Sequence, residues 1–441
     1  MSTRHVLVGS GIASLSAAES IRRVDARAQI VMVSTEGDPL YSRPGLAYLL
    51  TREVPEKQLT IRSSQELAAL NITRVHGRAT VLNTEQHSLL LDSGERMPYD
   101  RLLLATGATS IPADFPGASL DGVVQLDGLA DARDLIARCA GGRRAVVIGG
   151  GSTALELVEG FHARGLETHY LMRGERYWSR VFDRVESAIV EARLQAHGVH
   201  LHRFCSVQEA IGEDGRLREV LLTTGERLPC DLLAVAVGVR PRMELGVAAG
   251  LRTERGILVN EYLETSAPDV YAAGDVAQVH DPVTLQAQLD TLWASALQQG
   301  RVAGLNMAGM RVVHRKHPPL NVTRVAGVTA TIIGAVGASD DPDLLTLTRG
   351  QSERWVADPA SWSVSGARRD DRLRVVVSGR AIVGAVVMGD QELSQPLAHL
   401  IGEEVDISAL RPVLERSPEE ALDRLLEFCH AHVSDRAARH W

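Results

Sequence analysis

The chain contains one nucleotide-binding pattern twice. Residues 5–14 and residues 145–154 each carry a short apolar run, then G-x-G-x-x-small, then a helix-like stretch. A second signal is also repeated: M-P-Y-D at 97–100 leads through an apolar run to A-T-G, and L-P-C-D at 228–231 leads to A-V-G. Glycine-rich turns between a strand and a helix are common, but two matched signals in the same order indicate a duplicated domain. We therefore expect a fold that holds two dinucleotides.

Composition limits the classes of function. A net charge of −8 over 441 residues argues against a nucleic-acid-binding protein, because neutralising phosphates needs a basic surface. The longest apolar runs are far shorter than the roughly 20 residues of a membrane helix. Only four residues precede the first apolar strand, so no signal peptide is expected and a cytoplasmic location is predicted.

The four cysteines are too dispersed to form a local redox or metal motif. Cys139, Cys205, Cys230 and Cys429 include no C-x-x-C or similar pair, so neither a metal cage nor a vicinal dithiol is encoded. We expect all four to be small buried or surface residues and predict no metal site.

The predicted fold is α/β, with two doubly wound, three-layer dinucleotide-binding domains, one inserted in the other, and a C-terminal α+β domain. The first domain is expected over residues 1–115 and 245–315. The inserted domain is expected over residues 116–244, and the C-terminal interface domain over residues 316–441. We interpret residues 366–372 as an exposed turn. The other expected elements are helices at 14–24, 285–307, 391–401 and 418–433, a strand at 30–33, hairpin strands within 201–222 turning at 214–215, and β-rich runs at 322–334, 373–378 and 382–388.

The first glycine turn has the residues that a pyrophosphate site needs. Gly9 allows the tight turn, Gly11 lets the backbone approach the phosphates, and Ser14 replaces the third glycine at the helix–sheet contact. Glu36, just past the second strand, is the candidate carboxylate for an adenosine ribose. An ordinary exposed loop carboxylate is the alternative for Glu36.

The second glycine turn repeats this arrangement without the carboxylate. Gly149, Gly151 and Ala154 take the three positions, but Arg173 and Arg176 follow the second strand. Arginine there tends to accommodate the 2′-phosphate of NADP, so the sequence favours NADPH slightly over NADH. The alternative is that both arginines are solvated loop residues.

In combination, these motifs resemble the FAD- and NAD(P)-dependent pyridine nucleotide oxidoreductases, in particular the branch of ferredoxin reductases, rubredoxin reductases and nitrite reductase flavoproteins. The resemblance covers residues 4–310 and implies FAD in the first domain and NAD(P)H in the second. It implies that Asp275 bonds the ribityl chain of FAD and that Gly274 lies beside the pyrophosphate. Glu156 matches a glutamate beside the nicotinamide.

The resemblance assigns further residues to the cofactors. Thr106 and Gly107 match a segment close to the flavin, and Arg43 and Pro44 match a pair beside the isoalloxazine. The remaining matches are Ala79 at the adenine, Trp293 in a helix near the pyrimidine end of the flavin, and Gly238 as the counterpart of Gly107 in the second copy.

Two departures from the relatives are visible. Tyr48 stands where several electron-transferring relatives have a lysine near flavin N5. The first cysteine of the chain is Cys139, whereas disulfide reductases and peroxidases carry cysteines near the flavin in the first domain. Thiol chemistry at the flavin is therefore not expected, and no catalytic residue is assigned with certainty, with Glu156 and Tyr48 as the candidates.

The sequence thus predicts a flavoprotein oxidoreductase that passes hydride from NAD(P)H to FAD and then electrons to an acceptor. The acceptor would be a ferredoxin- or rubredoxin-type protein or a nitrite reductase-like subunit. Two alternatives stay open: an NAD(P)H oxidase that uses oxygen, and a flavin-bearing redox-sensing interaction protein with little turnover. The C-terminal domain would either build a homodimer interface or cover the flavin and select the acceptor.

Overall fold

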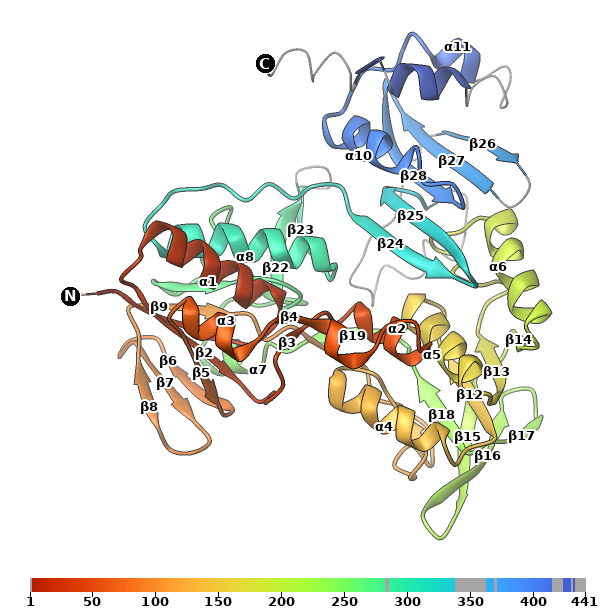
Figure 1. Cartoon of the computed structure of the whole chain (residues 1–441), viewed down its shortest axis with the longest axis horizontal. Coiled ribbons are helices and arrows are strands. Elements are labelled where there is room, and N and C mark those ends of the chain that lie inside the picture. Colours follow the sequence, from red (N-terminus) through yellow and green to blue (C-terminus); the bar gives the residue numbers. More distant parts are fainter. Residues whose placement is uncertain are drawn as a thin grey trace. The chain divides into compact units, whose positions relative to one another are not determined.

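The computed structural model describes residues 2–281, 285–337, 362–368, 371–414, 423–429 and 431–432 (Figure 1). The chain divides into two compact units. Unit 1 consists of residues 1–111, 127–132 and 239–317, and unit 2 of residues 112–126, 133–238 and 318–441. The two dinucleotide-binding patterns therefore lie in different units, whereas the C-terminal segment groups with the second pattern. The three domain boundaries expected from the sequence remain a proposal.

Unit 1 is built on a five-stranded parallel sheet in the order β21-β9-β1-β2-β5. Its strands are β1 (Arg4–Val8), β2 (Gln29–Ser34), β5 (Ile72–His76), β9 (Arg101–Leu104) and β21 (Val270–Ala272). Most of these strands are continuous apolar runs, as expected where helices cover both faces of a parallel sheet. The last strand comes from the far side of the insertion in sequence, so unit 1 is assembled from distant parts of the chain.

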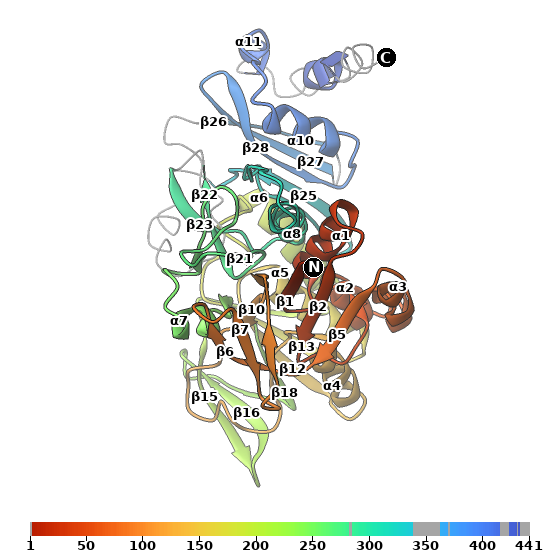
Figure 2. The same cartoon turned by 90° about the vertical axis from the view of Figure 1, so that its left-hand side faces the viewer.

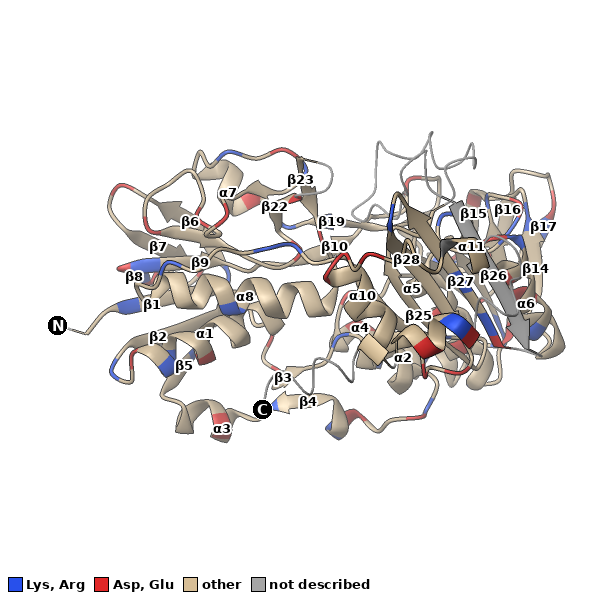
Figure 3. Ribbon diagram, turned by 90° about the horizontal axis from the view of Figure 1, so that it is seen from above, with Lys and Arg blue, Asp and Glu red and all other residues tan. Residues whose placement is uncertain are grey.

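Helices α1 (Ile12–Val24) and α8 (Trp293–Met307) lie side by side in unit 1 (Figures 1 and 2). A Cβ on Gly300 would lie 2.1 Å from the carbonyl oxygen of Ala13, and one on Gly304 would lie 2.4 Å from that of Ala17. Only glycine allows such close backbone packing. Arg301 is the one charged residue of α8, and the rest of the helix is uncharged in Figure 3.

The remaining elements of unit 1 surround this α/β core. An antiparallel meander of β6 (Ala79–Asn83), β7 (Ser88–Leu91) and β8 (Arg96–Pro98) follows β5. The others are β3 (Leu40–Tyr41), α2 (Gly45–Leu50), η1 (Glu56–Leu59), β4 (Thr60–Arg62), α3 (Ser64–Ala69), β10 (Ala108–Ser110), β19 (Val239–Pro241), α7 (Glu244–Ala248), β20 (Ile257–Leu258), β22 (Ala277–Asp281) and β23 (Gln286–Leu289); α4 (Leu129–Cys139) begins in unit 1 and ends in unit 2.

Unit 2 contains a second five-stranded parallel sheet in the order β11-β18-β12-β13-β14. Its strands are β11 (Val123–Val124), β12 (Arg144–Ile148), β13 (Glu167–Met172), β14 (His200–Arg203) and β18 (Leu232–Val235), with helices α5 (Ser152–Ala163) and α6 (Arg184–Ala196). Its meander is β15 (Val207–Glu213), β16 (Arg216–Leu222) and β17 (Arg227–Pro229). The β15–β16 hairpin, which projects in Figure 2, turns at Asp214 and Gly215 with φ of 52° and 78°, so the expected turn is confirmed.

The repeated P-x-D pattern has the same structural role in both copies. The Asp100 carboxylate accepts a hydrogen bond of 2.6 Å from the backbone N–H of Arg4, at the start of β1. The Asp231 carboxylate accepts from the backbone N–H groups of Arg143 and Arg144, at 2.8 and 3.0 Å, where β12 begins. Each aspartate therefore anchors the strand that leads into a glycine turn.

The C-terminal part of unit 2 is a five-stranded antiparallel sheet in the order β24-β25-β28-β27-β26, with α10 (Ser394–Gly402) packed against it (Figure 2). Its elements are β24 (Leu320–Val325), β25 (Val328–Gly334), β26 (Trp362–Arg368), β27 (Asp371–Ser378), β28 (Ala381–Met388) and α11 (Arg411–Leu414). Residues 423–429 are also helical. The expected helix at 418–433 lies partly outside the described residues.

Two expectations about elements were wrong. Residues 286–289 form strand β23 and not the start of a helix, because the helix begins only at Trp293. The β-rich run expected at 322–334 is confirmed: it forms a hairpin of two strands, which turns at Ala326 and Gly327 with positive φ. The exposed turn expected at 366–372 is shorter, since residues 366–368 and 371–372 belong to paired strands.

The end of that presumed turn is buried in an ion-pair network. Arg372 is 9% exposed and pairs with Asp183 at 2.5 Å. Arg374 pairs with the fully buried Glu186 at 2.8 Å and also donates to the carbonyl oxygen of Val181 at 2.6 Å. These contacts join β27 to the start of α6. The sequence predicted an exposed turn that ends at Arg372. In the structure, Arg372 and Arg374 lie on one face of β27 and are buried.

Within the part of the chain that the structure describes, no helix combines the length and apolar character needed to cross a membrane.

Candidate functional site

The glycine turn of unit 1 is tightly folded and leaves helix N–H groups open. Gly9 has a φ of +122°, and a Cβ there would lie 2.1 Å from the carbonyl oxygen of Ala105. Gly11 caps α1 without a side-chain hydrogen bond, and the first turn of α1 has no acidic residue. Unsatisfied N–H groups and the positive end of the helix dipole make such a terminus an anion site. Ser14 is fully buried, as expected for a small residue at the helix–sheet contact.

A second helix terminus meets this turn. A Cβ on Gly274 would lie 3.2 Å from the Cβ of Ala13 in α1 and 3.6 Å from the Cβ of Ala296 in α8. The N-cap of α8 also lacks a side-chain hydrogen bond, and its first turn has no acidic residue. The start of α1, the start of α8 and the turn after β21 therefore converge on one place. Two helix N-termini at one place suit a ligand with two phosphates.

Gln299 holds the turn after β21 in position. Its side-chain oxygen accepts a hydrogen bond of 2.8 Å from the backbone N–H of Gly274, and the residue is fully buried. The sequence gives no sign of this role, because glutamine in a helix is usually exposed.

Asp275 follows this turn as a partly buried carboxyl group. Enclosure by protein raises its pKa to about 6, since the favourable effect of Arg43 does not offset burial. Asp290 raises it further. Above this pH the group is a carboxylate, which can accept a hydrogen bond from a ligand hydroxyl.

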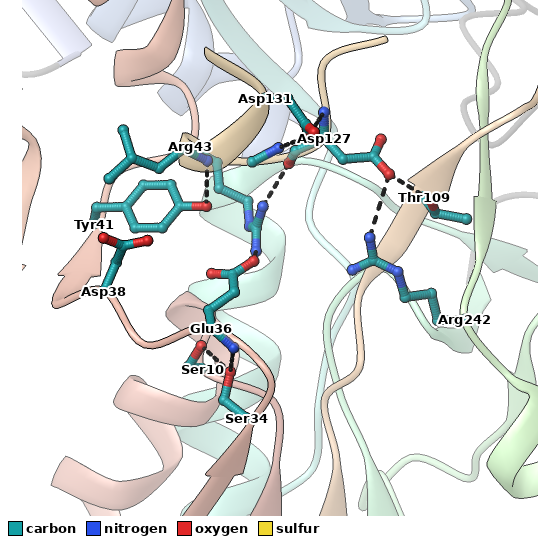
Figure 4. Close-up of polar contacts among 12 residues, drawn as sticks. Ser10, Ser34, Glu36, Asp38, Tyr41, Arg43, Thr109, Asp127, Asp131 and Arg242 are labelled. Carbon is teal, nitrogen blue, oxygen red and sulfur yellow. Dashed lines mark hydrogen bonds and ion pairs between the residues drawn. The ribbon is translucent and has the colours of Figure 1, made fainter. Parts of the chain in front are cut away.

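Glu36 is held in a network of polar contacts (Figure 4). Its carboxylate pairs with Arg43 at 2.5 Å, and Arg43 also donates to the carbonyl oxygen of Asp127 at 2.5 Å. The backbone N–H of Glu36 donates to Ser34 Oγ, which bonds Ser10 Oγ at 2.8 Å. The end of β2 is thereby tied to the glycine turn. Glu36 is not a freely solvated loop residue in this structure.

Asp127 is a site residue that the sequence did not reveal (Figure 4). Its carboxylate accepts hydrogen bonds from the hydroxyls of Thr109 and Ser110, both at 2.5 Å, and pairs with Arg242 at 3.3 Å. Burial opposes its ionisation, but the hydrogen bonds outweigh burial and lower the pKa of Asp127. Asp131 accepts from the backbone N–H groups of Asp127 and the next residue, each at 2.9 Å. The partners of the Asp127 carboxylate come from β10 and from Arg242, two segments distant in sequence, so no local motif marks Asp127.

Thr106 and Gly107 are joined to the strand that returns from the insertion. The hydroxyl of Thr106 donates to the carbonyl oxygen of Arg242 at 2.6 Å, and the N–H of Arg242 donates to the carbonyl oxygen of Gly107 at 2.9 Å. Next to them, β10 pairs with β19. The remaining residues expected near FAD lie at element ends or in short elements: Pro44 at the N-cap of α2, Tyr48 within α2, Ala79 at the start of β6 and Trp293 as the first residue of α8.

The glycine turn of unit 2 has the same construction. Gly149 has a φ of +150°, and a Cβ there would lie 2.2 Å from the carbonyl oxygen of Ala236 and 2.9 Å from the Cβ of Ala154. Gly151 caps α5 without a side-chain hydrogen bond. Ala154 is fully buried, as the small third position requires. Gly238, with a φ of +123°, is exposed two residues further along from Ala236.

Glu156 lies in the first two turns of α5. The residue is partly buried, and loss of hydration raises the pKa of its carboxyl group to about 7. At neutral pH this group is poised between an acceptor and a donor of hydrogen bonds.

The two arginines after β13 differ. The guanidinium of Arg176 donates to the carbonyl oxygen of Ser179 at 3.3 Å. Arg173 is exposed directly after the strand. On the neighbouring strand, Arg203 pairs with the buried Glu191. Arg173 is thus the exposed cation nearest in sequence to the end of β13, where an adenosine ribose would lie.

Comparisons with known proteins agree with this geometry. A model of the pyridine nucleotide-disulphide oxidoreductases matches residues 3–300. The nitrite reductase [NAD(P)H] of Bacillus subtilis is 28% identical over 91% of this chain, which spans about half (48%) of that relative. An NADH oxidase of Methanocaldococcus jannaschii is 25% identical over 97% of this chain and 94% of its own length. A ferredoxin reductase structure from Rhodopseudomonas palustris has a TM-score of 0.83 at 25% identity and covers 95% of this chain and 97% of its own.

Proposed function

This chain belongs to the pyridine nucleotide-disulphide oxidoreductase family and is an FAD-dependent NAD(P)H oxidoreductase, and from this premise we propose that it reduces an electron-acceptor protein without a redox-active cysteine. The acceptor is a one-electron carrier of the ferredoxin or rubredoxin type, or a nitrite reductase-like subunit. Bound FAD accepts hydride from NAD(P)H and can release electrons singly, which couples a two-electron donor to such a carrier.

Unit 1 holds FAD in this proposal, and the observation that carries the assignment is the convergence of two helix N-termini. The starts of α1 and α8 and the turn at Gly274 supply N–H groups and dipoles for the diphosphate. Asp275 accepts from the ribityl hydroxyls, and Glu36 accepts from the adenosine ribose while paired with Arg43. A carboxylate has room for both partners because its two oxygens offer about four acceptor sites.

Arg43 and Asp127 position the wall of this site. Arg43 bridges the end of β2 and the segment before α4, while Asp127 connects that segment to Thr109 and Arg242. The proposed contacts of Arg43, Thr106 and Gly107 with the flavin therefore depend on one continuous network. Pro44 and Tyr48 follow in α2, and Ala79 and Trp293 complete the proposed set in unit 1.

Unit 2 holds the nicotinamide nucleotide. The N–H groups at the start of α5 bind its diphosphate, and Arg173 binds the 2′-phosphate of NADPH. Gly149 and Gly151 shape the turn, with Ala154 beneath it and Gly238 alongside. Glu156, with its pKa raised to about 7, can donate to the carbonyl oxygen of a carboxamide when protonated and accept from its amino group when ionised.

The cysteines support electron transfer without thiol chemistry. All four are buried, none forms a disulfide, and none belongs to unit 1. Burial raises the pKa of Cys230 to about 12 and that of Cys429 to about 11, so neither forms a thiolate near neutral pH. A bound flavin would therefore pass its electrons to an external acceptor.

A second candidate function is an NAD(P)H oxidase that delivers electrons to oxygen. The near full-length match to an NADH oxidase favours it, because the lengths of the two chains agree better than for the nitrite reductase. The two functions differ in the acceptor and not in the cofactor sites.

Anaerobic stopped-flow spectroscopy tests the proposal. NADH or NADPH should bleach the flavin band, and reoxidation should be fast with a ferredoxin or rubredoxin and slow with oxygen. Fast reoxidation by oxygen alone would support the oxidase. If no flavin can be bound to the purified chain, the proposal fails. A variant in which all four cysteines are serine should retain flavin reduction and reoxidation.

A further inference from the structure

Three histidines and two glutamates gather on one face of the unit 2 sheet. Glu167 and His169 are two residues apart in β13, so their side chains point to the same face. His200 and His202 have the same relation in β14, and His169 is the direct register partner of His200. Glu226, before β17, reaches the same cluster.

Four of these groups form a chain of nitrogen and oxygen atoms. Nε2 of His169 is 3.4 Å from Oε1 of Glu167, and Nδ1 of His169 is 3.0 Å from Nε2 of His202. Nδ1 of His202 is 3.7 Å from Oε2 of Glu226. The ring of His200 stacks on the ring of His169 with centroids 4.7 Å apart and an angle of 22°.

This row of four side chains lacks one cation for its contacts. It has three contacts, but two neutral imidazoles supply only two N–H protons. If His169 donates to His202, its Nε2 lone pair faces the carboxylate of Glu167. If His202 donates to His169, its own Nδ1 lone pair faces the carboxylate of Glu226. Either tautomer leaves a lone pair opposed to an anion, so the arrangement is completed by a cation.

We infer that Glu167, His169 and His200 bind a divalent transition-metal ion of the zinc class. One ligand atom of each lies within 4.8 Å of the others. Zinc–nitrogen and zinc–oxygen bonds of about 2.0–2.2 Å bring ligand atoms closer together than this, so the side chains, including the stacked rings of His169 and His200, have to rotate when the ion binds. Imidazole and carboxylate ligands suit zinc, and water completes a tetrahedral site.

The surrounding groups orient the ligands. With the ion on Nε2 of His169, Nδ1–H of His169 donates to Nε2 of His202, which keeps the Nε2 lone pair of His169 on the metal. Nδ1 of His202 then faces the carboxylate of Glu226, 3.7 Å away. Arg144 donates to Oε2 of Glu167 at 3.0 Å, which leaves Oε1 for the ion.

The site is separate from the nucleotide site. Glu167 is the first residue of β13, whereas the Gly149 turn follows the last residue of the parallel strand β12. The ion would join β13 to β14, an edge strand that pairs only with β13 in this sheet. Its proposed role is therefore to fasten the edge of the unit 2 sheet. The sequence predicted no metal site, because that prediction considered only the spacing of the cysteines. The ligands proposed here are histidines and a glutamate on two strands, and they form no local motif.

Zinc binding to the tag-free, FAD-loaded full chain tests the inference. Isothermal titration with zinc chloride should show one ion per chain, and unfolding temperature should rise with zinc because the ion binds the folded state. His169→Ala and His200→Ala should each weaken binding by at least roughly tenfold. His280→Ala, an exposed histidine of unit 1, is the matched control and should bind zinc normally.

Cobalt supplies a readout that does not depend on variants. Co²⁺ bound to the wild-type chain should give the visible absorption of a tetrahedral nitrogen and oxygen site, and one equivalent of zinc should abolish it. Absence of this band, or zinc binding that His169→Ala and His200→Ala leave unchanged, would overturn the inference. Flavin reduction by NAD(P)H should persist after chelation, so failure here leaves the proposed function intact.

His202 is a positioning residue whose role has its own test. His202→Ala should weaken zinc binding about 10–100-fold, as for other groups that orient metal ligands. His202→Gln should restore part of the affinity, since an amide oxygen can accept from Nδ1–H of His169. Unfolding temperature without metal should be equal in the two variants. Equal zinc affinity in both would refute the orienting role.

Discussion

The two parallel sheets share a construction but differ in what surrounds their glycine turns. In each, an aspartate anchors the first strand and a glycine packs on a backbone carbonyl, Ala105 in unit 1 and Ala236 in unit 2. Unit 1 adds a second helix, α8, whose N-cap residue makes no side-chain hydrogen bond and whose start converges with that of α1 at Gly274. At the turn of unit 2, the described residues place the start of α5.

This difference teaches how one module can serve two kinds of ligand. A ligand diphosphate held between two helix termini has more N–H donors than one held by a single terminus. Unit 1 therefore suits a permanently bound cofactor, and unit 2 suits a nucleotide that exchanges in every turnover. The two sheets also differ in the origin of one edge strand. In unit 1 this strand, β21, follows the insertion in sequence, whereas in unit 2 the strand β11 precedes β12.

Substitution of the first glycine in each turn should have the largest effect and should distinguish the two units. Gly9→Val and Gly149→Val each place a Cβ within 2.2 Å of a carbonyl oxygen at positive φ. Gly9→Val should purify without FAD. Gly149→Val should retain FAD but lose at least about 100-fold in the rate of flavin reduction, because the nucleotide is misplaced. Flavin absorbance and stopped-flow reduction measure the two outcomes.

Gly150→Ala is the control for both variants, because a Cβ there meets no atom within 4 Å. It should keep both cofactor activities. The opposite pattern, with FAD lost from Gly149→Val and kept by Gly9→Val, would reverse the assignment of the two units.

Asp275→Asn should separate FAD affinity from stability. Loss of a charged hydrogen bond costs roughly 1.5–3 kcal/mol, so FAD should bind about 10–100-fold more weakly to the apoprotein. The wild-type pKa of about 6 lies above the ordinary 3.8, so the folded apoprotein prefers the protonated form. Wild-type stability therefore falls as pH rises from about 4 to 6, and Asp275→Asn should remove this fall.

FAD titration and thermal unfolding between pH 4 and pH 8 measure these two effects. Asp114→Asn, at an exposed position of unit 2, should change neither. Unchanged FAD affinity in Asp275→Asn would reject the ribityl contact.

Glu156→Gln in unit 2 should change the pH dependence of stability in the same direction as Asp275→Asn, but at higher pH. The pKa of about 7 exceeds the ordinary 4.5, so wild-type stability falls as pH rises through this range. The variant should be more stable than the wild type by roughly 1–3 kcal/mol above pH 7 and equal to it near pH 4. Denaturant unfolding as a function of pH measures the difference. A parallel offset at every pH would mean that the carboxyl group does not titrate as proposed.

Arg173→Ala should have the smallest effect of these substitutions, and it tests the nucleotide preference of unit 2. Loss of one exposed arginine–phosphate contact should lower kcat/KM for NADPH about tenfold and leave NADH nearly unaffected. Arg218→Ala, an exposed arginine of β16, is the control and should preserve both values. Equal effects on the two nucleotides would return Arg173 to the status of a solvated loop residue.

Local patterns predicted the parts of the fold that depend on local geometry. Gly9 and Gly149 occupy backbone conformations that other residues rarely adopt, and the Asp214–Gly215 turn is encoded by two adjacent residues. Asp127, by contrast, has its partners in β10 and at Arg242, so its position depends on how distant segments pair. The burial of Arg372 likewise depends on Asp183, far away in sequence.

The same reasoning applies to side chains whose types were known but whose neighbours were not. Glu36 was expected to face a ribose, and the structure adds the pairing with Arg43. The histidines of β13 and β14 look unremarkable in sequence, because only the parallel register brings His169 beside His200. Residue spacing along one segment is visible in a sequence, whereas the register between segments is not.

The close packing of α1 against α8 also sets an order of events during synthesis of the chain. Unit 1 lacks its fifth strand and α8 until residues 270–307 have left the ribosome, although α1 ends at Val24. The parallel sheet of unit 2 needs only residues 123–235. At about 5–20 residues per second, the nascent first module waits many seconds for its partner helix. Until then the apolar strands of the first module lack β21 and α8. We therefore expect chaperones to bind this module early and FAD to bind it late.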